Sequence, residues 1–161
     1  MFPDSTGENA SRAQNDFDSA VEAYRQAQVA FLNGDLKPVM DLISRRDDVT
    51  LANPLGPPRR GRADVAKAAA DAAAQVSDGS VRGFEEVSRY STPDLGYVVQ
   101  IERFQARFAD SGTISPYSLR VTMIFRREGD TWRVVHRHAD PIMTLRPAST
   151  IIEREESIRS G

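Results

Sequence analysis

The chain has 161 residues, of which 40% are hydrophobic and 27% charged, and its formal net charge is −2. This length fits one domain with a real core, and cysteine is absent, which excludes disulfides, thiolate metal sites and cysteine nucleophiles. There is neither a basic stripe typical of nucleic-acid binding nor an apolar run of the ~20 residues that span a membrane. We therefore expect a cytoplasmic protein whose partners include no nucleic acid and no membrane.

The N-terminal third predicts a disordered segment followed by two helices. Residues 1–15 are polar with almost nothing to bury, so we expect them to be disordered. Apolar residues then recur at helical spacing over 17–32, with Asp16 or Asp18 as the N-cap and Asn33-Gly34 as the stop. A second, short helix is expected over 36–43, capped by Asp35.

The remaining elements indicate an α+β layout. Residues 49–52 predict a brief strand, 53–61 a loop because the segment holds three prolines, and 62–76 an alanine-rich helix. Four strands follow at 81–90, 96–108, 117–127 and 131–140, separated by short turns. Neighbouring strands with such short connections pair antiparallel, so the second half predicts a meander.

The last hairpin predicts which side chains face the core. With its turn at Gly129-Asp130 and regular pairing, His136 opposes Met123 and His138 opposes Val121. Because side chains alternate across a sheet, the apolar inward face would include both histidines. It would hold Leu119, Val121, Met123, Phe125, Trp132, Val134, His136 and His138. The outward row would hold Arg120, Thr122, Ile124, Arg126, Arg133, Val135 and Arg137.

The same register places an acidic residue beside the histidines. Glu102 falls next to Val121, and Gln100 falls near Met123 and His136; a slip of one residue would reverse this. A lone buried carboxylate is costly, so Glu102 needs a partner or a proton. A Glu–His couple supplies either, and three interpretations stay open: ligand contacts, structural hydrogen bonding, and acid–base catalysis.

The candidate catalytic residues are therefore Glu102, His138 and His136. The candidate ligand-binding residues are Gln100, Trp132, Tyr24, Asn53 and Met123, with Tyr24 and Trp132 also suited to core packing. His136-x-His138-x-Asp140 offers metal-ligand chemistry, but residues two apart on a strand are separated by nearly ~7 Å. We expect no metal and no cofactor.

The order and spacing of the motifs resemble a known superfamily. They comprise a helix ending in Asn33-Gly34-Asp35, Gly61-Arg62 before the alanine-rich helix, Ile101-Glu102-Arg103, and a final strand that reads W-x-V-V-H-x-H from Trp132. This pattern, over residues 17–147, resembles the nuclear-transport-factor-2-like superfamily, and within it the SnoaL-like group and the association domain of calcium/calmodulin-dependent kinase II.

The resemblance implies a cone-shaped fold, in which N-terminal helices pack on a curved, mostly antiparallel sheet and enclose a pocket. It implies a domain over 16–147, a C-terminal tail over 148–161 and a homodimer formed through the outer sheet face. The inward polar cluster then favours a SnoaL-like pocket protein that binds a small apolar oxygen-bearing molecule, with acid–base transformation of that molecule as an open interpretation. An enzyme of this kind would be a cofactor-independent isomerase, cyclase, dehydratase or hydrolase. The alternative is a non-catalytic association module whose polar cluster is structural.

Overall fold

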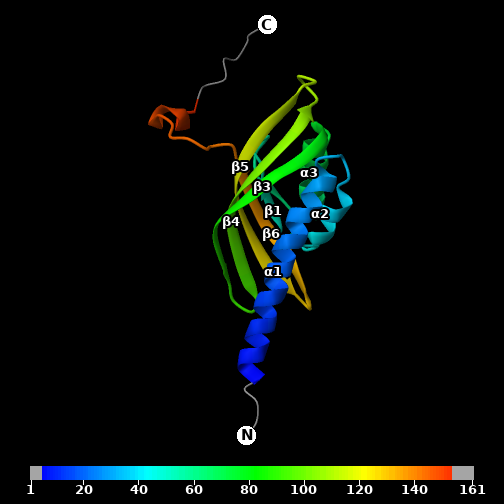
Figure 1. The fold of residues 1–161 in the computed structure, drawn as a ribbon, viewed down its shortest axis with the longest axis vertical. Helices are drawn as coiled ribbons and strands as arrows, with labels where there is room; N and C mark the ends of the chain where they lie inside the picture. Colours follow the sequence, from blue (N-terminus) through cyan, green and yellow to red (C-terminus); the bar gives the residue numbers. More distant parts are fainter. Residues whose placement is uncertain (1–4, 154–161) are drawn as a thin grey trace.

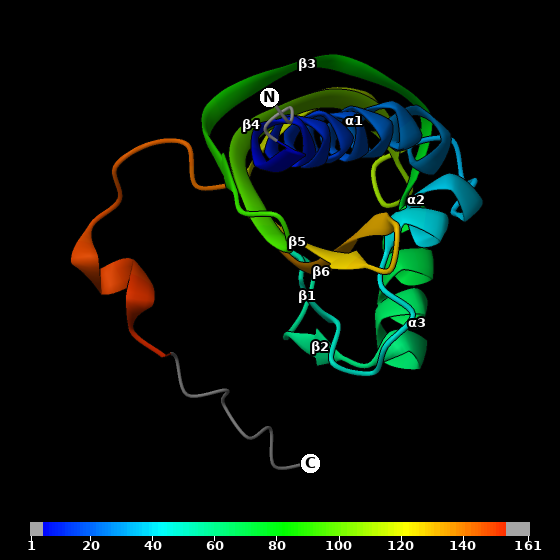
Figure 2. The same cartoon turned by 90° about the horizontal axis from the view of Figure 1, so that it is seen from below.

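The computed structural model describes residues 5–153 and shows helices packed on the concave side of one curved sheet (Figure 1). Six strands are arranged in the order β2-β1-β6-β5-β4-β3. The long strands β3 (Val76–Ser91) and β4 (Leu95–Phe108) arch around helix α1 (Ser5–Phe31), which Figure 2 shows nearly end-on. The α+β cone expected from the sequence is confirmed.

Helix α1 begins earlier than the sequence indicated. The segment 5–15 was expected to be disordered, but it continues the helix without a break, so neither Asp16 nor Asp18 is an N-cap. Ala13 is buried, and the Ser91 hydroxyl on β3 donates to Gln14 Oε1 at 2.7 Å. Extending a nucleated helix costs much less than starting one, so these contacts hold a segment with no apolar face of its own. Residues 1–4 lie outside the described part of the chain.

The helices α2 (Lys37–Leu42) and α3 (Arg62–Ala73) lie on the same side of the sheet as α1 (Figure 2). Arg62, the first residue of α3, donates to the carbonyls of Met40, Ile43 and Ser44 at 3.0–3.2 Å. These bonds satisfy carbonyls at the end of α2 and tie the two helices together. The proline-rich segment before α3 is a loop as predicted, apart from the two-residue edge strand β2 (Arg59–Arg60).

The meander is antiparallel as predicted, and β6 also receives a parallel neighbour. Strands β5 (Ile114–Glu128) and β6 (Thr131–Asp140) pair with each other, while β1 (Thr50–Ala52) runs parallel to β6. Thr50 is paired with His136 across this junction, and its hydroxyl lies 2.7 Å from His136 Nδ1. The short β1 strand thereby extends the sheet beneath α3.

The register of β5 and β6 contains a bulge that the sequence did not predict. Phe125 pairs with Val134, but Ile124 pairs with His136, so Val135 is an extra residue. A bulge reverses which face every later residue takes. Arg137 therefore pairs with Met123 on the inner side, and the prediction that Arg137 belongs to the outer row is wrong.

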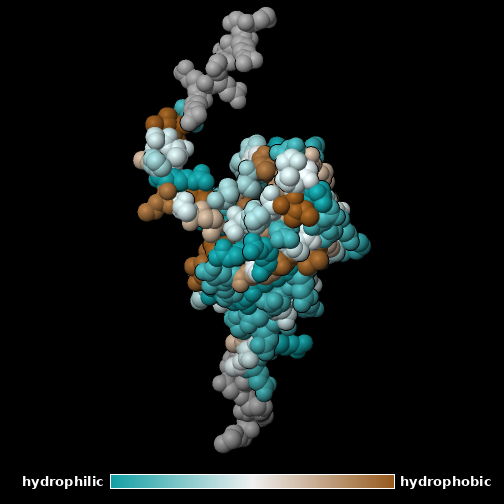
Figure 3. Space-filling model, turned by 45° about the horizontal axis from the view of Figure 1, so that its top comes forward, coloured by the Kyte–Doolittle hydropathy of each residue, from teal (hydrophilic) through white to brown (hydrophobic). Residues whose placement is uncertain are grey.

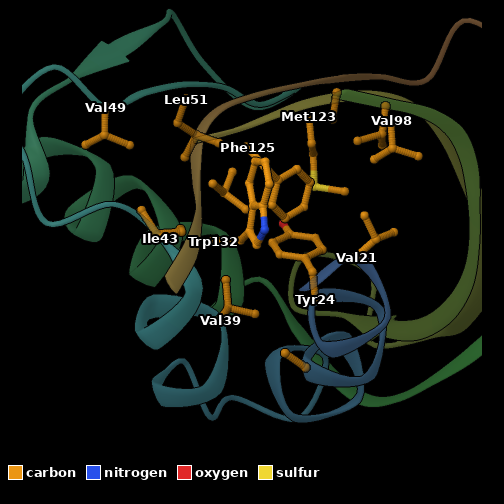
Figure 4. Close-up of a cluster of buried hydrophobic side chains, with 14 of the residues drawn as sticks. Val21, Tyr24, Val39, Ile43, Val49, Leu51, Val98, Met123, Phe125 and Trp132 are labelled. Atoms are coloured by element: carbon orange, nitrogen blue, oxygen red, sulfur yellow. The ribbon is translucent and has the colours of Figure 1, made fainter. Parts of the chain in front are cut away.

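The core lies between α1, α2 and the concave face of the sheet. Tyr24 and Val21 of α1 point toward Met123, Phe125 and Trp132 of the sheet (Figure 4). The Phe17 ring packs on Phe125 and Trp132 with centroid distances of 5.5 and 5.2 Å. This packing encloses the apolar end of α1 and leaves the region beneath α3 less completely filled.

The C-terminal segment after β6 stands away from the body (Figures 1 and 3). It includes the short 3₁₀ helix η1 (Ala148–Ile151), and its apolar side chains are exposed, with Leu145 and Ile151 at 104% and 86%. Residues 154–161, the rest of the expected tail, lie outside the described residues. Within residues 5–153, no helix is both long and apolar enough to cross a membrane.

Candidate functional site

A cavity of about 260 Å³ lies between the helices and the concave face of the sheet. Most of its wall is apolar, and every layer of the fold contributes to it. The lining includes Phe31 of α1, Val39 of α2, Leu51 of β1, Val65 and Ala69 of α3, Phe104 of β4, Leu119 of β5 and Val134 of β6. A space of this kind suits an apolar ligand held by a few polar groups.

The polar end of the cavity is built around Arg137. Its Nη2 donates to Glu102 Oε2 at 2.7 Å, and the Arg137 side chain is 14% exposed whereas that of Glu102 is fully buried. Glu102 is not among the lining residues, so Arg137 stands between this carboxylate and the cavity. Removing two charges from water is costly, and their mutual attraction offsets much of that cost.

A chain of hydrogen bonds fixes Glu102 from behind. Gln100 Nε2 donates to Glu102 Oε1 at 3.0 Å, and Arg25 of α1 donates to Gln100 Oε1 through both Nε and Nη2 at 2.9 and 2.7 Å. Arg25 in turn pairs with Glu22 and Glu86 nearer the surface. Both oxygens of Glu102 thus accept hydrogen bonds from side chains, Oε2 from Arg137 on the cavity side and Oε1 from Gln100 behind it.

Two tyrosines border the cavity beside Arg137. Burial raises the pKa of Tyr24, the charge of Arg137 opposes this, and Glu102 adds to it. Burial likewise raises the pKa of Tyr117 to about 12. Both phenols therefore stay protonated at neutral pH and can donate a hydrogen bond.

The charge of Arg137 is similarly secure. Burial alone would lower the pKa of its guanidinium, but Tyr24, Glu102 and Tyr117 raise it above its ordinary value. The cavity therefore has a permanent cation at its polar end.

Two buried nitrogens in the described residues lack a hydrogen-bond partner: Arg137 Nε and Trp132 Nε1. Both are N–H donors, and an unsatisfied buried donor costs about 1–3 kcal/mol. Arg137 lines the cavity, but its Nε itself is buried away from that space, so a ligand oxygen reaches the Nε only when the guanidinium turns toward it. This end of the cavity therefore has an unpaired hydrogen-bond donor, which an acceptor atom of a ligand can satisfy.

The predicted inward position of both histidines is wrong. The bulge at Val135 turns His136 and His138 to the outer face, where they pair with Ile124 and Thr122. His138 is 56% exposed and lies 3.7 Å from Asp140, and neither histidine lines the cavity. Partial burial and the neighbouring His138 lower the pKa of His136. The predicted Glu102–His138 couple does not form, and Arg137 takes the place of His138.

The inward direction predicted for Glu102 and Gln100 is confirmed, since both are fully buried. Their partners on β5 are Leu119 and Val121, so the predicted pairing with Val121 and Met123 was displaced by two residues. A shift of two leaves the face unchanged, which explains why the direction was nonetheless right.

The structure separates the predicted ligand-binding residues into two groups. Tyr24 and Asn53 line the cavity, whereas Gln100, Met123 and Trp132 are buried behind its wall. The polar lining residues also include Arg137, Tyr117 and Gln28, which the sequence did not indicate as ligand-binding residues. Arg137 lies between the two histidines of the W-x-V-V-H-x-H strand, so alternation puts it on the opposite side from them, and the bulge makes its side the inner one.

The three side chains that offered metal-ligand chemistry in the sequence lie on the same strand. Because His136, His138 and Asp140 all face outward, they surround no pocket, and within residues 5–153 no three His, Asp or Glu side chains gather as metal ligands would.

Comparisons with known proteins agree with this fold. The family model of the SnoaL-like domain matches residues 20–144. The chain therefore belongs to the SnoaL-like domain family. No curated protein sequence matches the chain significantly.

Solved structures with the same fold carry different descriptions. A candidate calcium/calmodulin-dependent protein kinase type II association domain from Thiobacillus denitrificans is 26% identical, with a TM-score of 0.64 over 78% of this chain and 94% of that one. A candidate dehydratase of the NTF2-like family from Streptomyces avermitilis is 20% identical, with a TM-score of 0.69 over 83% and 99%. A ketosteroid isomerase-like protein from Erwinia carotovora is 18% identical, with a TM-score of 0.66 over 81% and 96%. Such variety on one fold means that function has to be argued from the site.

Proposed function

We propose that this domain binds a small, largely apolar molecule through one neutral oxygen atom, which accepts hydrogen bonds at the Arg137 end of the cavity. The observation that carries the proposal is the Arg137 guanidinium on the wall of an apolar space, with a buried Nε donor that has no partner in the described residues. The protonated phenols of Tyr24 and Tyr117 are further donors at the same end. A ketone, ester or hydroxyl oxygen fits this set, because Glu102 already balances the Arg137 charge.

Glu102 acts in this proposal through Arg137. It orients the guanidinium and keeps it charged, and it does not meet the ligand because it lies behind the lining. The proposal is accordingly one of binding, and it assigns no bond-breaking step to Glu102, His136 or His138.

The test is thermal unfolding with and without methyl octyl ketone and naphthol as probes. A ligand that binds only the folded state stabilises it by about 2.7 kcal/mol at a hundredfold excess over Kd, so a bound probe raises the Tm. Ala69→Leu should abolish the shift, because Ala69 is a buried lining residue of α3 and a larger side chain fills the cavity. Ala70→Leu is the matched control, since Ala70 is exposed on the same helix.

The double variant Glu102→Leu, Arg137→Met removes both partners of the ion pair at once. It should still fold, and it should bind the ketone more weakly than the wild type. The proposal is overturned if no probe raises the wild-type Tm, or if the Ala69→Leu variant keeps the full shift.

A second candidate function, association into a homodimer, is favoured by the outer face of the sheet. The helices cover only the concave face (Figure 2), and the convex face presents Tyr97, which is 38% exposed, and the half-buried Val99, Ile101 and Ile124. Apolar side chains on an uncovered sheet face are typical of an interface. Binding inside the cone and pairing outside it use different surfaces, so the two functions are compatible.

A further inference from the structure

A second hollow of about 290 Å³ adjoins the cavity near its mouth. It lies between α3 and the loop that connects β1 to β2. Residues that line both spaces include Leu51 and Asn53 on one side, Ala72 and Gln75 on the other, and Leu55 on the loop. The hollow and the cavity are therefore separated by no more than these side chains. Leu55 is 66% exposed, so its side chain is not held by core packing.

The outer hollow carries an uncompensated positive charge. Arg59 of β2 lines it and forms no ion pair with any residue of the described range 5–153, whereas the one acidic lining residue, Asp71, is bound by Lys67 at 2.7 Å. Asn53 adds a donor, because its Oδ1 accepts the N–H of Leu55 at 3.0 Å and leaves its amide NH₂ available. Both free polar groups thus suit an anion.

The acidic group nearest the inner cavity lies elsewhere. Asp110, in the turn after β4, borders the inner cavity and not the outer hollow. An anionic ligand group would be repelled near Asp110 and attracted near Arg59. The charges of Asp110 and Arg59 therefore favour the outer hollow over the inner cavity as the place for a negatively charged group of the ligand.

We propose that the natural ligand is an elongated oxo or hydroxy acid, with its neutral oxygen at Arg137, an apolar chain past Leu55 and Ala72, and a carboxylate at Arg59. This inference rests on the proposed function and adds the ligand class. Alone, each hollow is small beside the ~300–1,000 Å³ of ordinary ligand pockets, but the two together hold a medium-length chain.

The experiment compares methyl octyl ketone with the acid in which a carboxylate replaces the terminal methyl of the octyl chain. Calorimetric titration of the full chain gives both dissociation constants. We expect the keto acid to bind about two- to five-fold more tightly, the range that one exposed ion pair supplies, and the advantage to shrink at high salt.

Arg59→Ala should remove this advantage and leave the affinity for the plain ketone unchanged. Arg60→Ala is the matched control: Arg60 is the exposed neighbour on the same two-residue strand but does not line the hollow, so the advantage should remain.

The outcomes separate the two proposals. If neither compound binds, the proposed function fails and the inference fails with it. If the ketone binds but the keto acid binds no more tightly, the inference alone is overturned. If Arg59→Ala and Arg60→Ala reduce the affinity advantage of the keto acid equally, the inference is likewise overturned. Equal reductions would indicate a general electrostatic attraction and no contact between the carboxylate and Arg59.

Discussion

The Glu102–Arg137 ion pair is the residue-level feature on which the cavity depends. Glu102 has no exposed surface, and its two oxygens are held by Arg137 and Gln100. Removing one partner of such a pair leaves a buried charge, which costs far more than the pair itself contributes. The arrangement therefore predicts strong coupling between the two positions.

Glu102→Leu should lower the free energy of unfolding by about 3–5 kcal/mol, because it leaves the Arg137 guanidinium buried without a counter-charge. Adding Arg137→Met should restore much of that loss. Urea denaturation of both single variants and the double variant gives the coupling energy. Glu85→Gln, which breaks the exposed Glu85–Arg103 pair at 2.6 Å, is the control and should cost less than about 1 kcal/mol. Additive losses in the double variant would contradict the coupling.

Tyr117 predicts a loss of stability at alkaline pH. Burial raises the pKa of its phenol from 10.0 to about 12 in the folded state, so between these values the folded chain keeps a proton that the unfolded chain has released. The contribution of the protonated Tyr117 phenol to the free energy of unfolding is complete below pH 10, and it is lost as pH rises toward 12. Urea midpoints at increasing pH should fall less steeply for Tyr117→Phe than for wild type. Tyr90→Phe, at a side chain 60% exposed, is the control for the loss of a phenol hydroxyl outside the cavity.

Single residues were predictable from the sequence only where alternation held. Glu102 and Gln100 were placed inward correctly, since a register error of two residues preserves the face. The histidines were placed wrongly because Val135 is inserted as a bulge. Valine suits a regular strand as well as a bulge, so nothing in the residue type marked the change.

At the scale of elements, the C-terminal end of α1 lies directly against β3. Asn33, just past α1, donates to the carbonyl of Gly79 at 3.0 Å and accepts from the Gly79 N–H at 3.2 Å. A Cβ atom at Gly79 would collide with the Leu32 side chain and lie 2.8 Å from the Leu32 carbonyl oxygen. Glycine is therefore required for the helix end to contact the strand.

Gly79→Ala should lower the free energy of unfolding by about 1–3 kcal/mol, because backbone must move to make room. Gly56→Ala is the control: a Cβ there meets no heavy atom within 4 Å, and the expected change is within about 0.5 kcal/mol. Thermal or chemical unfolding of the two variants decides the matter. If the Gly79→Ala variant is as stable as the Gly56→Ala variant, the contact between α1 and β3 accommodates a Cβ atom without loss of stability, and the prediction is wrong.

The elements themselves followed from the sequence more completely than their ends did. The bounds of β6 were predicted correctly, because turn residues and a polar–apolar alternation define it on both sides. The start of α1 was missed because 5–15 carry no apolar stripe and are held by contacts from β3. Strand β3 begins five residues earlier than expected, at Val76, where Ser77 and Arg107 pair despite the polar sequence. Pairing with a neighbour, which local sequence does not encode, extends both elements.

At the scale of the whole molecule, the sheet has two faces with separate roles. Its concave face supplies the cavity wall, and its convex face carries Ile124, Thr122 and the outward histidines with no helix over them (Figure 2). The sequence anticipated this division through the superfamily resemblance, which also implied the homodimer. It could not anticipate that His136 and His138 replace Arg137 in the outward row.

Ile124→Lys should therefore convert a dimer to a monomer near 17.8 kDa without unfolding the cone. Ile124 lies on the convex face of β5, and in the proposed homodimer two symmetry-related lysines would bring like charges together at the interface. Light scattering behind size-exclusion chromatography at micromolar concentrations measures the mass, and circular dichroism checks the fold. Val29→Lys is the control, because Val29 is 51% exposed on α1, away from this face. A monomeric wild type, or an Ile124→Lys variant that stays dimeric, would show that the convex face is not the interface.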